Sequence, residues 1–207
     1  MNIDSLYRIF FLYFRTKRMQ AFQQKFGLTD QTCILDVGGS EFNWRLLSTM
    51  PKVTILNISL PTERNPQFNY LVADGCHLPF WDNAFEIVYS NSVIEHLFNS
   101  DSQRLFADEC RRVGQRYYIQ TPNYHFIIEP HWLAPGFHWL PRWLQRRLAR
   151  NFTGRGLITR LSTAECETLL DEIHLLDEDE VRCLFPDAEI WRERTMGMIK
   201  SLIAARQ

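Results

Sequence analysis

The sequence has little that would tie it to a membrane interior, a secretory route or nucleic acid. None of its hydrophobic runs approaches the roughly 20 residues that a transmembrane helix needs. The apolar stretch 9–14 is short and its basic residues follow it, so we expect no secretory signal. The formal net charge of −1 provides no basic footprint, which argues against general nucleic-acid binding.

Cysteine is present without a pattern. The chain has no C-x-x-C pair and no Cys/His cluster at metal-ligand spacing among Cys33, Cys76, Cys110, Cys166 and Cys183. An odd number of cysteines without a framework fits free thiols in a reducing cytosol better than disulfides or a zinc site. No repeat or low-complexity linker divides the 207 residues, so we expect one cytoplasmic domain, 1–207.

The first positive signal is the stretch 32–44, TCILDVGGSEFNW. A short apolar run carries one acid, Asp36, and ends at Gly38-Gly39 before a helical stretch. This order is typical of the first strand and turn of a nucleotide-binding α/β sheet. Glycine lets a ligand approach the backbone there, and the amides at the next helix N-terminus can face it.

Strands and helices alternate along the rest of the chain. Besides the first strand at about 32–37, apolar and β-branched runs predict strands at 52–57, 69–73, 85–90 and 116–121. A helix at 100–113, with Ser100 and Gln103 as its capping pair, should stop at Gly114. Two final strands, 188–193 and 199–205, flank a tight turn at Met196-Gly197. The alternation predicts βαβ units and a mostly parallel sheet.

Three further helices follow from local patterns. Residues 3–26, within an N-terminal helical segment 1–29, carry apolar side chains at three- and four-residue steps up to Gly27. Their mixed aromatic and basic residues leave two interpretations open, a helix packed on the domain or an interfacial helix at a membrane surface. Capping boxes open two helices in the tail, at Ser162 with Glu165 and at Asp177 with Glu180.

The stretch 71–97, LVADGCHLPFWDNAFEIVYSNSVIEHL, resembles the class I S-adenosylmethionine-dependent methyltransferases, particularly the group with the ubiquinone-pathway C- and O-methyltransferases. It has that group's order of strand, acid, Leu-Pro-Phe turn, Asn-x-Phe-Glu strand opening and Glu-His pair. The resemblance covers roughly residues 30–121, and QTPNYHFIIEPH and FPDAEI extend it to bacterial methyltransferase-like proteins of unassigned substrate. It implies an α/β fold, a Rossmann-like seven-stranded, mostly parallel sheet with a C-terminal antiparallel hairpin and helices on both faces.

The resemblance also implies S-adenosylmethionine as cofactor, bound across the carboxyl ends of the first four strands. Asp74 falls on the acid that accepts from the adenine amino group, whereas Asn57 replaces the acid that holds the ribose. Ser40 and Phe42 replace two glycines of the usual motif, which would cost roughly 1–2 kcal/mol wherever a positive φ is needed. The expected cofactor residues are Asp36, Gly38, Gly39, Ser40, Asn57, Ile58, Asp74, Gly75, Cys76, Asn91 and Ser92.

On the acceptor side, the stretch 121–141 is where such folds build the acceptor pocket, and it is rich in aromatic side chains and histidines. The candidate catalytic residues are His96, Glu129 and His131, since a histidine can act as general base for a hydroxyl acceptor. A loop-capping role for His96 and simple core packing of the aromatic stretch remain the alternatives. Some relatives bind a divalent metal with a Glu-x-x-Glu-His run; here Ser92 stands at the first acid, so no metal is expected.

We therefore predict S-adenosylmethionine-dependent methyl transfer to a small-molecule or lipid- or sugar-linked acceptor, held by an acceptor-side insertion at 122–160. The arginine-rich stretch 141–150 is either a solvated face or a site for an anionic acceptor or a membrane surface, which would make the protein peripheral to a membrane. A catalytically silent methyltransferase fold that serves as a binding partner or scaffold is the main alternative. A nicotinamide-dependent oxidoreductase ranks far lower, because G-x-G-x-x-G is missing.

Overall fold

The computed structural model describes residues 3–97 and 99–207, with side chains from Leu12 onward except that of residue 98. Its elements are α1 (Ile3–Phe26), β1 (Cys33–Val37), α2 (Glu41–Trp44), β2 (Lys52–Asn57), β3 (Asn69–Val72), β4 (Phe85–Asn91), η1 (Ile94–His96), α3 (Ser100–Val113), β5 (Gly114–Pro122), β6 (Ile128–Glu129), β7 (Ala134–Pro135), η2 (Phe137–Trp139), α4 (Arg142–Phe152), α5 (Gly154–Thr159), α6 (Thr163–Glu172), α7 (Glu178–Leu184), β8 (Glu189–Thr195) and β9 (Met198–Arg206).

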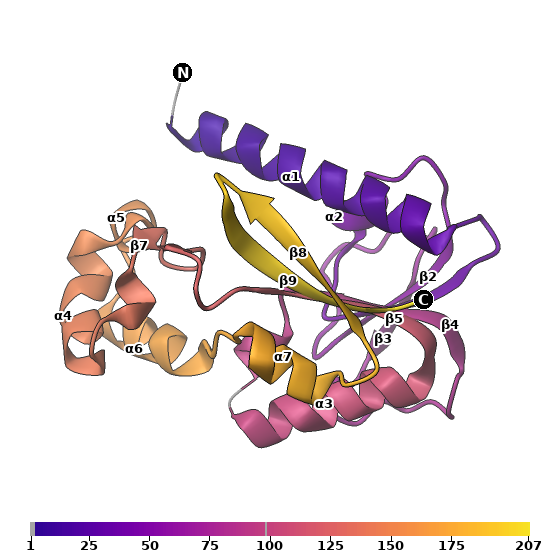
Figure 1. Ribbon diagram of the computed structural model, residues 1–207. Coiled ribbons are helices and arrows are strands. Elements are labelled where there is room, and N and C mark those ends of the chain that lie inside the picture. Colours follow the sequence, from indigo (N-terminus) through magenta and orange to yellow (C-terminus); the bar gives the residue numbers. More distant parts are fainter. Residues whose placement is uncertain (1–2, 98) are drawn as a thin grey trace. The chain divides into compact units, whose positions relative to one another are not determined.

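Within this described part the strands form a seven-stranded sheet in the order β3-β2-β1-β4-β5-β9-β8, and β6 pairs with β7 alone (Figure 1). β1 runs parallel to both β2 and β4, β2 runs parallel to β3, and β8 and β9 are antiparallel. The predicted mostly parallel sheet with a terminal antiparallel pair is therefore confirmed. The predicted strands and long helices lie within a few residues of their observed bounds.

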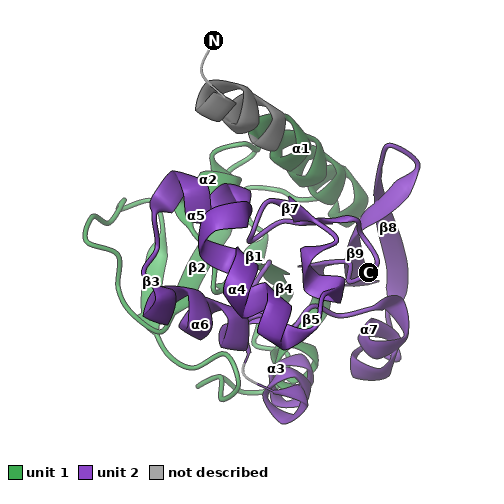
Figure 2. Ribbon diagram, turned by 90° about the vertical axis from the view of Figure 1, so that its left-hand side faces the viewer, with its two compact units in different colours: residues 1–91, 109–118, 207 green, residues 92–108, 119–206 purple. Residues whose placement is uncertain are grey.

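The chain forms two compact units, each assembled from separate stretches (Figure 2). Unit 1 comprises residues 1–91, 109–118 and 207, and unit 2 comprises residues 92–108 and 119–206. Unit 1 thus contains β1 to β4 with α1 and α2, and unit 2 contains the segment after β5, the helices α4 to α7 and the hairpin β8–β9. The expectation of one domain over 1–207 stays a prediction.

The core of unit 1 is aromatic and includes the second half of α1. Met19, Phe22 and Phe26 are buried, and the Phe22 ring lies 4.8 Å from that of Tyr118 and 5.0 Å from that of Tyr89, centre to centre. Gly27, at φ +62°, ends the helix as predicted. Packing on the domain is thus the correct interpretation of residues 19–26, while the side chains of residues 3–11 lie outside the described residues.

Unit 2 has its own small core. Ala149 of α4 and Leu170 of α6 pack there with Trp132 and Phe137, which precede α4 in the chain. Both predicted capping boxes are present at the starts of α6 and α7. The predicted cap of α3 was wrong: the Asn99 side chain accepts from the Ser102 amide at 2.8 Å, so the chain turns into the helix one residue before Ser100. No helix among the described residues combines the length and the apolar character needed to cross a bilayer.

Candidate active site

The turn after β1 is built by two glycines with different tasks. Gly38 has φ +73°, a left-handed conformation that glycine adopts freely, and its amide donates to the Leu56 carbonyl at 2.7 Å. A Cβ on Gly39 would lie 1.8 Å from Oδ2 of Asp36, so no other residue fits there. Ser40 has φ −147° and ψ 161°, which is ordinary extended backbone. The serine in place of a glycine therefore causes no strain.

Asp36 lies beneath this turn with no exposed surface. Its Oδ2 accepts from the Trp44 indole at 2.8 Å, and its Oδ1 has no hydrogen-bond partner among the described residues. Burial raises the pKa of Asp36 to about 7, and the Trp44 bond offsets part of that rise. The carboxyl thus supports the glycine turn from inside and presents no surface to solvent.

Asn57, at the end of β2, is engaged with the same turn. Its Nδ2 donates to the Gly39 carbonyl at 2.8 Å. An aspartate could not make this bond, because a carboxylate has no donor. The amide that replaces the usual acid therefore stabilises the turn.

A cavity of about 310 Å³ opens in unit 1 beside this turn, lined by Gly39, Ser40, Glu41, Phe42, Arg45, Ile55, Asn57, Pro61 and Tyr70. Glu41 accepts from the Tyr70 hydroxyl and from the Asn65 amide, and the Tyr70 bond is the largest cause that lowers the pKa of Glu41. Three expected cofactor residues, Gly39, Ser40 and Asn57, meet at this cavity. Glu41 and Tyr70 were not predicted, although an acid in the first turn after a glycine loop was a readable signal.

The expected adenine acid, Asp74, is exposed and ionised. Its Oδ1 accepts from the Cys76 amide at 2.9 Å, and this bond is the main cause that lowers the pKa of Asp74. The Cys76 amide, expected to face the cofactor, is thus used within the Asp74–Cys76 turn that also contains Gly75. Ile58 is 84% exposed.

The end of β4 is held by α1. Oδ1 of Asn91 accepts from the Arg18 guanidinium at 2.6 Å, so the orientation of the expected cofactor residue depends on the N-terminal helix. Ser92 is the first residue of unit 2 and has φ +57°. Its amide and hydroxyl donate to the Gln120 backbone and side-chain oxygens at 3.0 and 3.1 Å.

The role of Asn57 can be tested by restoring the acid. We expect Asn57→Asp to bind S-adenosylmethionine at least about fivefold more weakly than the wild type does, because a carboxylate would face the Gly39 carbonyl. Asn57→Ala, which removes the bond without adding charge, should lie between the two. Isothermal titration calorimetry decides: tighter binding by Asn57→Asp than by the wild type would contradict the assigned role.

Unit 2 brings four candidate ligands or proton carriers together. Glu95 is fully buried, its Oε2 accepts from the Thr121 hydroxyl at 3.0 Å, and its Oε1 lies 3.9 Å from Nε2 of His131. Nδ1 of His131 lies 2.7 Å from Oε1 of Glu129, which is also buried. The His96 ring stands edge-on to that of His131, with ring centres 4.8 Å apart. All three predicted catalytic residues therefore meet, and Glu95 joins them.

The electrostatics of this cluster favour uncharged forms. Burial raises the pKa of Glu95 to about 7, and desolvation together with the neighbouring His131 lowers the pKa of His96 to about 4. A histidine with so low a pKa is a weak proton acceptor, whereas His131 is oriented by a carboxylate as a general base would be.

The same atoms could also hold a metal ion. Ligand atoms of Glu95, His96 and His131 lie within 4.8 Å of one another. Imidazole and carboxylate ligands suit Zn²⁺, and a metal-bound histidine usually donates its other nitrogen to a carboxylate, as His131 can to Glu129. In the sequence only Glu95 and His96 stand at the positions of the Glu-x-x-Glu-His metal-binding run, and the structure supplies His131 as a third ligand.

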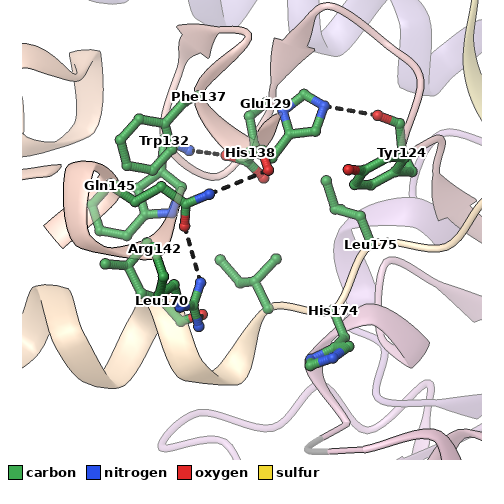
Figure 3. A pocket seen from close by; sticks show the side chains of 11 residues that line it. Tyr124, Glu129, Trp132, Phe137, His138, Arg142, Gln145, Leu170, His174 and Leu175 are labelled. Carbon is green, nitrogen blue, oxygen red and sulfur yellow. Dashed lines mark hydrogen bonds between the residues drawn. The ribbon is translucent and has the colours of Figure 1, made fainter. Parts of the chain in front are cut away.

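A cavity of about 370 Å³ lies next to this cluster within unit 2 (Figure 3). Its walls come from the loop after β5, from α4 and from the end of α6: Tyr124, Glu129, Trp132, Phe137, His138, Arg142, Gln145, Leu170, Ile173, His174 and Leu175. Its polar groups are held in place, because His138 Nε2 lies 2.7 Å from the Tyr124 carbonyl and Gln145 donates to the His138 carbonyl at 3.2 Å. The aromatic stretch was predicted, but the wall from α6 was not.

Comparisons with known proteins agree with this geometry. Residues 37–116 match the family model described as a methyltransferase domain. A magnesium protoporphyrin IX methyltransferase from Synechocystis, solved with bound SAH, has a TM-score of 0.56 at 11% identity, covering 93% of this chain and 82% of that one. A SAM-dependent methyltransferase from Methanosarcina mazei has a TM-score of 0.51 at 16% identity, covering 86% and 93%. The chain therefore contains a segment that matches a methyltransferase domain, and it has the Rossmann-like fold of these solved methyltransferases.

The Synechocystis methyltransferase was also solved with bound SAM, and that structure has a TM-score of 0.53 at 11% identity, covering 93% of this chain and 79% of that one. A structure from Rhodobacter sphaeroides described as a zinc-dependent alcohol dehydrogenase is also similar, with a TM-score of 0.58 at 12% identity, covering 91% and 87%. At 11%, 16% and 12% identity, these three structural likenesses show the fold alone. Among curated protein sequences, none matches this one.

Proposed function

We propose that the enzyme transfers the methyl group of S-adenosylmethionine to a hydroxyl oxygen of a small molecule bound in the 370 Å³ cavity of unit 2. This cavity is the observation that carries the proposal. Its volume lies at the small-ligand end of the usual range, and its walls combine apolar and aromatic side chains with a few fixed polar groups. If the acceptor is linked to a lipid or a sugar, only the part that carries the reacting hydroxyl would enter the cavity.

The acceptor oxygen needs a proton acceptor, and the pair Glu129–His131 supports this step. Glu129 lines the cavity and bonds Nδ1 of His131, which leaves Nε2 with a lone pair that can receive the proton. Glu129 would also stabilise the imidazolium that forms. The new bond joins the acceptor oxygen to the methyl carbon, the sulfur–methyl bond breaks, and the sulfonium becomes the neutral thioether of S-adenosylhomocysteine.

Substitution of His131 tests the proposal. Methyl-deuterated S-adenosylmethionine and a small-molecule extract are incubated with the enzyme, and labelled products are measured by mass spectrometry. We expect His131→Gln to form product at least about a hundredfold more slowly, because a general base contributes 10²–10⁴-fold. Its affinity for S-adenosylmethionine should not change. His125→Gln, an exposed histidine of the same segment, is the matched control.

The outcomes separate three interpretations. An unchanged rate in His131→Gln would refute the proton-accepting role, and absence of any labelled product with wild type would favour the silent-fold alternative. Loss of activity on chelation, with recovery on adding Zn²⁺, would instead assign Glu95, His96 and His131 to a metal.

A further inference from the structure

We propose that α4 and α5 form a docking surface for an anionic membrane. The inference rests on the exposed side chains of unit 2 and is independent of the acceptor proposed above. Residues 130–164 contain six arginines and neither aspartate nor glutamate, in a chain whose net charge is −1. The rest of the chain has 17 lysines and arginines (23 − 6) against 24 acids, a net charge of −7, so positive charge is concentrated in this one segment of an otherwise acidic molecule.

The helix α4 has two faces with separate tasks. Gln145 and Ala149 are buried, and Ala149 belongs to the small core of unit 2. At 100° per residue, Trp143, Arg146, Arg147 and Arg150 fall within about a third of a turn on the other side. All four are exposed, Trp143 by 66%. We call these four residues the Arg–Trp face.

The arginines of this face are not neutralised by the protein. Arg142, by contrast, donates to the Asp171 carboxylate at 2.9 Å and to the Gln145 side chain at 3.1 Å, which fixes it against α6 and the cavity. No carboxylate within the described ranges forms an ion pair with Arg146, Arg147 or Arg150. Their charge is available to an outside partner.

Exposed apolar side chains accompany the charge. Phe152 at the end of α4 is 73% exposed, and Leu157 and Ile158 of α5 are 63% and 58% exposed. The two helices are in contact, since a Cβ on Gly156 would lie 2.3 Å from the carbonyl oxygens of Ala149 and Arg150. The apolar groups of α5 therefore continue directly from the C-terminal end of α4.

This combination selects a lipid surface. Guanidinium groups recognise phosphates, which nucleic acids and lipid headgroups share. Exposed leucine, isoleucine and phenylalanine gain nothing from a phosphate backbone, but they gain from insertion at the boundary of headgroups and acyl chains, where tryptophan is also favoured. Basic residues near an anionic bilayer each add about fivefold in partitioning. The occupant is thus the surface of a bilayer that contains anionic lipid.

Vesicle sedimentation tests the proposal with the full chain. We expect the wild type to pellet with phosphatidylcholine vesicles that contain phosphatidylglycerol and to stay in solution with phosphatidylcholine alone. R146Q/R147Q/R150Q should weaken binding about a hundredfold, and Trp143→Ala should weaken it several-fold. K52Q/R64Q/R104Q removes three exposed cations from elsewhere and should bind as the wild type does.

Three results would overturn the docking surface: no pelleting with anionic vesicles, equal loss in the K52Q/R64Q/R104Q control, or no effect of Trp143→Ala and R146Q/R147Q/R150Q. Binding should weaken at about 1 M salt, where the Debye length falls to about 3 Å. A far-UV circular dichroism spectrum and a thermal unfolding midpoint equal to those of the wild type show that R146Q/R147Q/R150Q is folded. Its result then concerns the membrane alone, and failure of the acceptor proposal would leave it untouched.

Discussion

Replacing Gly39 by alanine should disable the cofactor site and destabilise unit 1. The added methyl would lie 1.8–2.0 Å from all three atoms of the Asp36 carboxyl group. That group is fully buried and accepts a hydrogen bond from the Trp44 indole, so it cannot move away from the methyl without breaking this bond. Overpacking of this kind costs about 1–3 kcal/mol in the unfolding free energy, and the displaced turn should weaken cofactor binding at least about tenfold.

Two variants control this experiment. Ser40→Ala changes the neighbouring residue, whose side chain makes no capping bond, and should alter the unfolding free energy by less than about 0.5 kcal/mol. In the Asp36→Ala background the clash disappears, so Gly39→Ala should cost clearly less there than in the wild type. The unfolding free energies of this double-mutant cycle are measured by urea unfolding. Purely additive effects would rule out the contact between the added methyl and Asp36 as the cause of the destabilisation.

The buried acid itself should make the protein less stable as the pH rises. The pKa of Asp36 is raised from 3.8 to about 7, so between these values the folded protein keeps a proton that the unfolded chain releases. The unfolding free energy must then fall as pH rises through this window, by an amount on the order of 4 kcal/mol by pH 8. Most of the change should occur between pH 5 and pH 7.

Asp36→Asn isolates this contribution, because an amide cannot titrate. We expect the variant to lose a large part of the decrease in unfolding free energy between pH 5 and pH 8, measured by urea titration at each pH. Some decrease should remain, since burial raises the pKa of Glu95 to about 7 as well. Asp74→Asn is the control, because the pKa of this exposed acid is lowered and it titrates below the window. A steep slope that persists unchanged in Asp36→Asn would disprove the assignment.

Much of the fold was readable because its signals are local. Buried β-branched runs gave the strands, and a capping box needs only four residues, as at Ser162 and Asp177. The cap of α3 was misassigned for the same reason: Asn99 and Ser100 are both good caps, and the backbone turn that chooses between them is not encoded in either residue alone.

The site was less readable, because its bonds join distant residues. The resemblance places Asn57 at the position of the ribose-binding acid, and nothing in the sequence connects its amide with the Gly39 carbonyl 18 residues earlier. In the same way, Glu41 meets Tyr70 across 29 residues. His131 joins Glu95 only through folding of the loop after β5. The sequence shows that these segments contain many titratable and aromatic side chains, but only the structure shows which of these side chains are in contact.

The aromatic packing of α1 has a practical consequence for anyone who shortens this protein. The sequence that matches the family begins at residue 37, yet Met19, Phe22 and Phe26 fill the space around Tyr89 and Tyr118. A fragment trimmed to residues 37–116 would lose Tyr118 as well as α1, and it would uncover the buried rings of Trp44 and Tyr89, which favours association or aggregation. Residues outside the matched segment therefore complete the core of unit 1, and a fragment meant to keep that core intact has to include them.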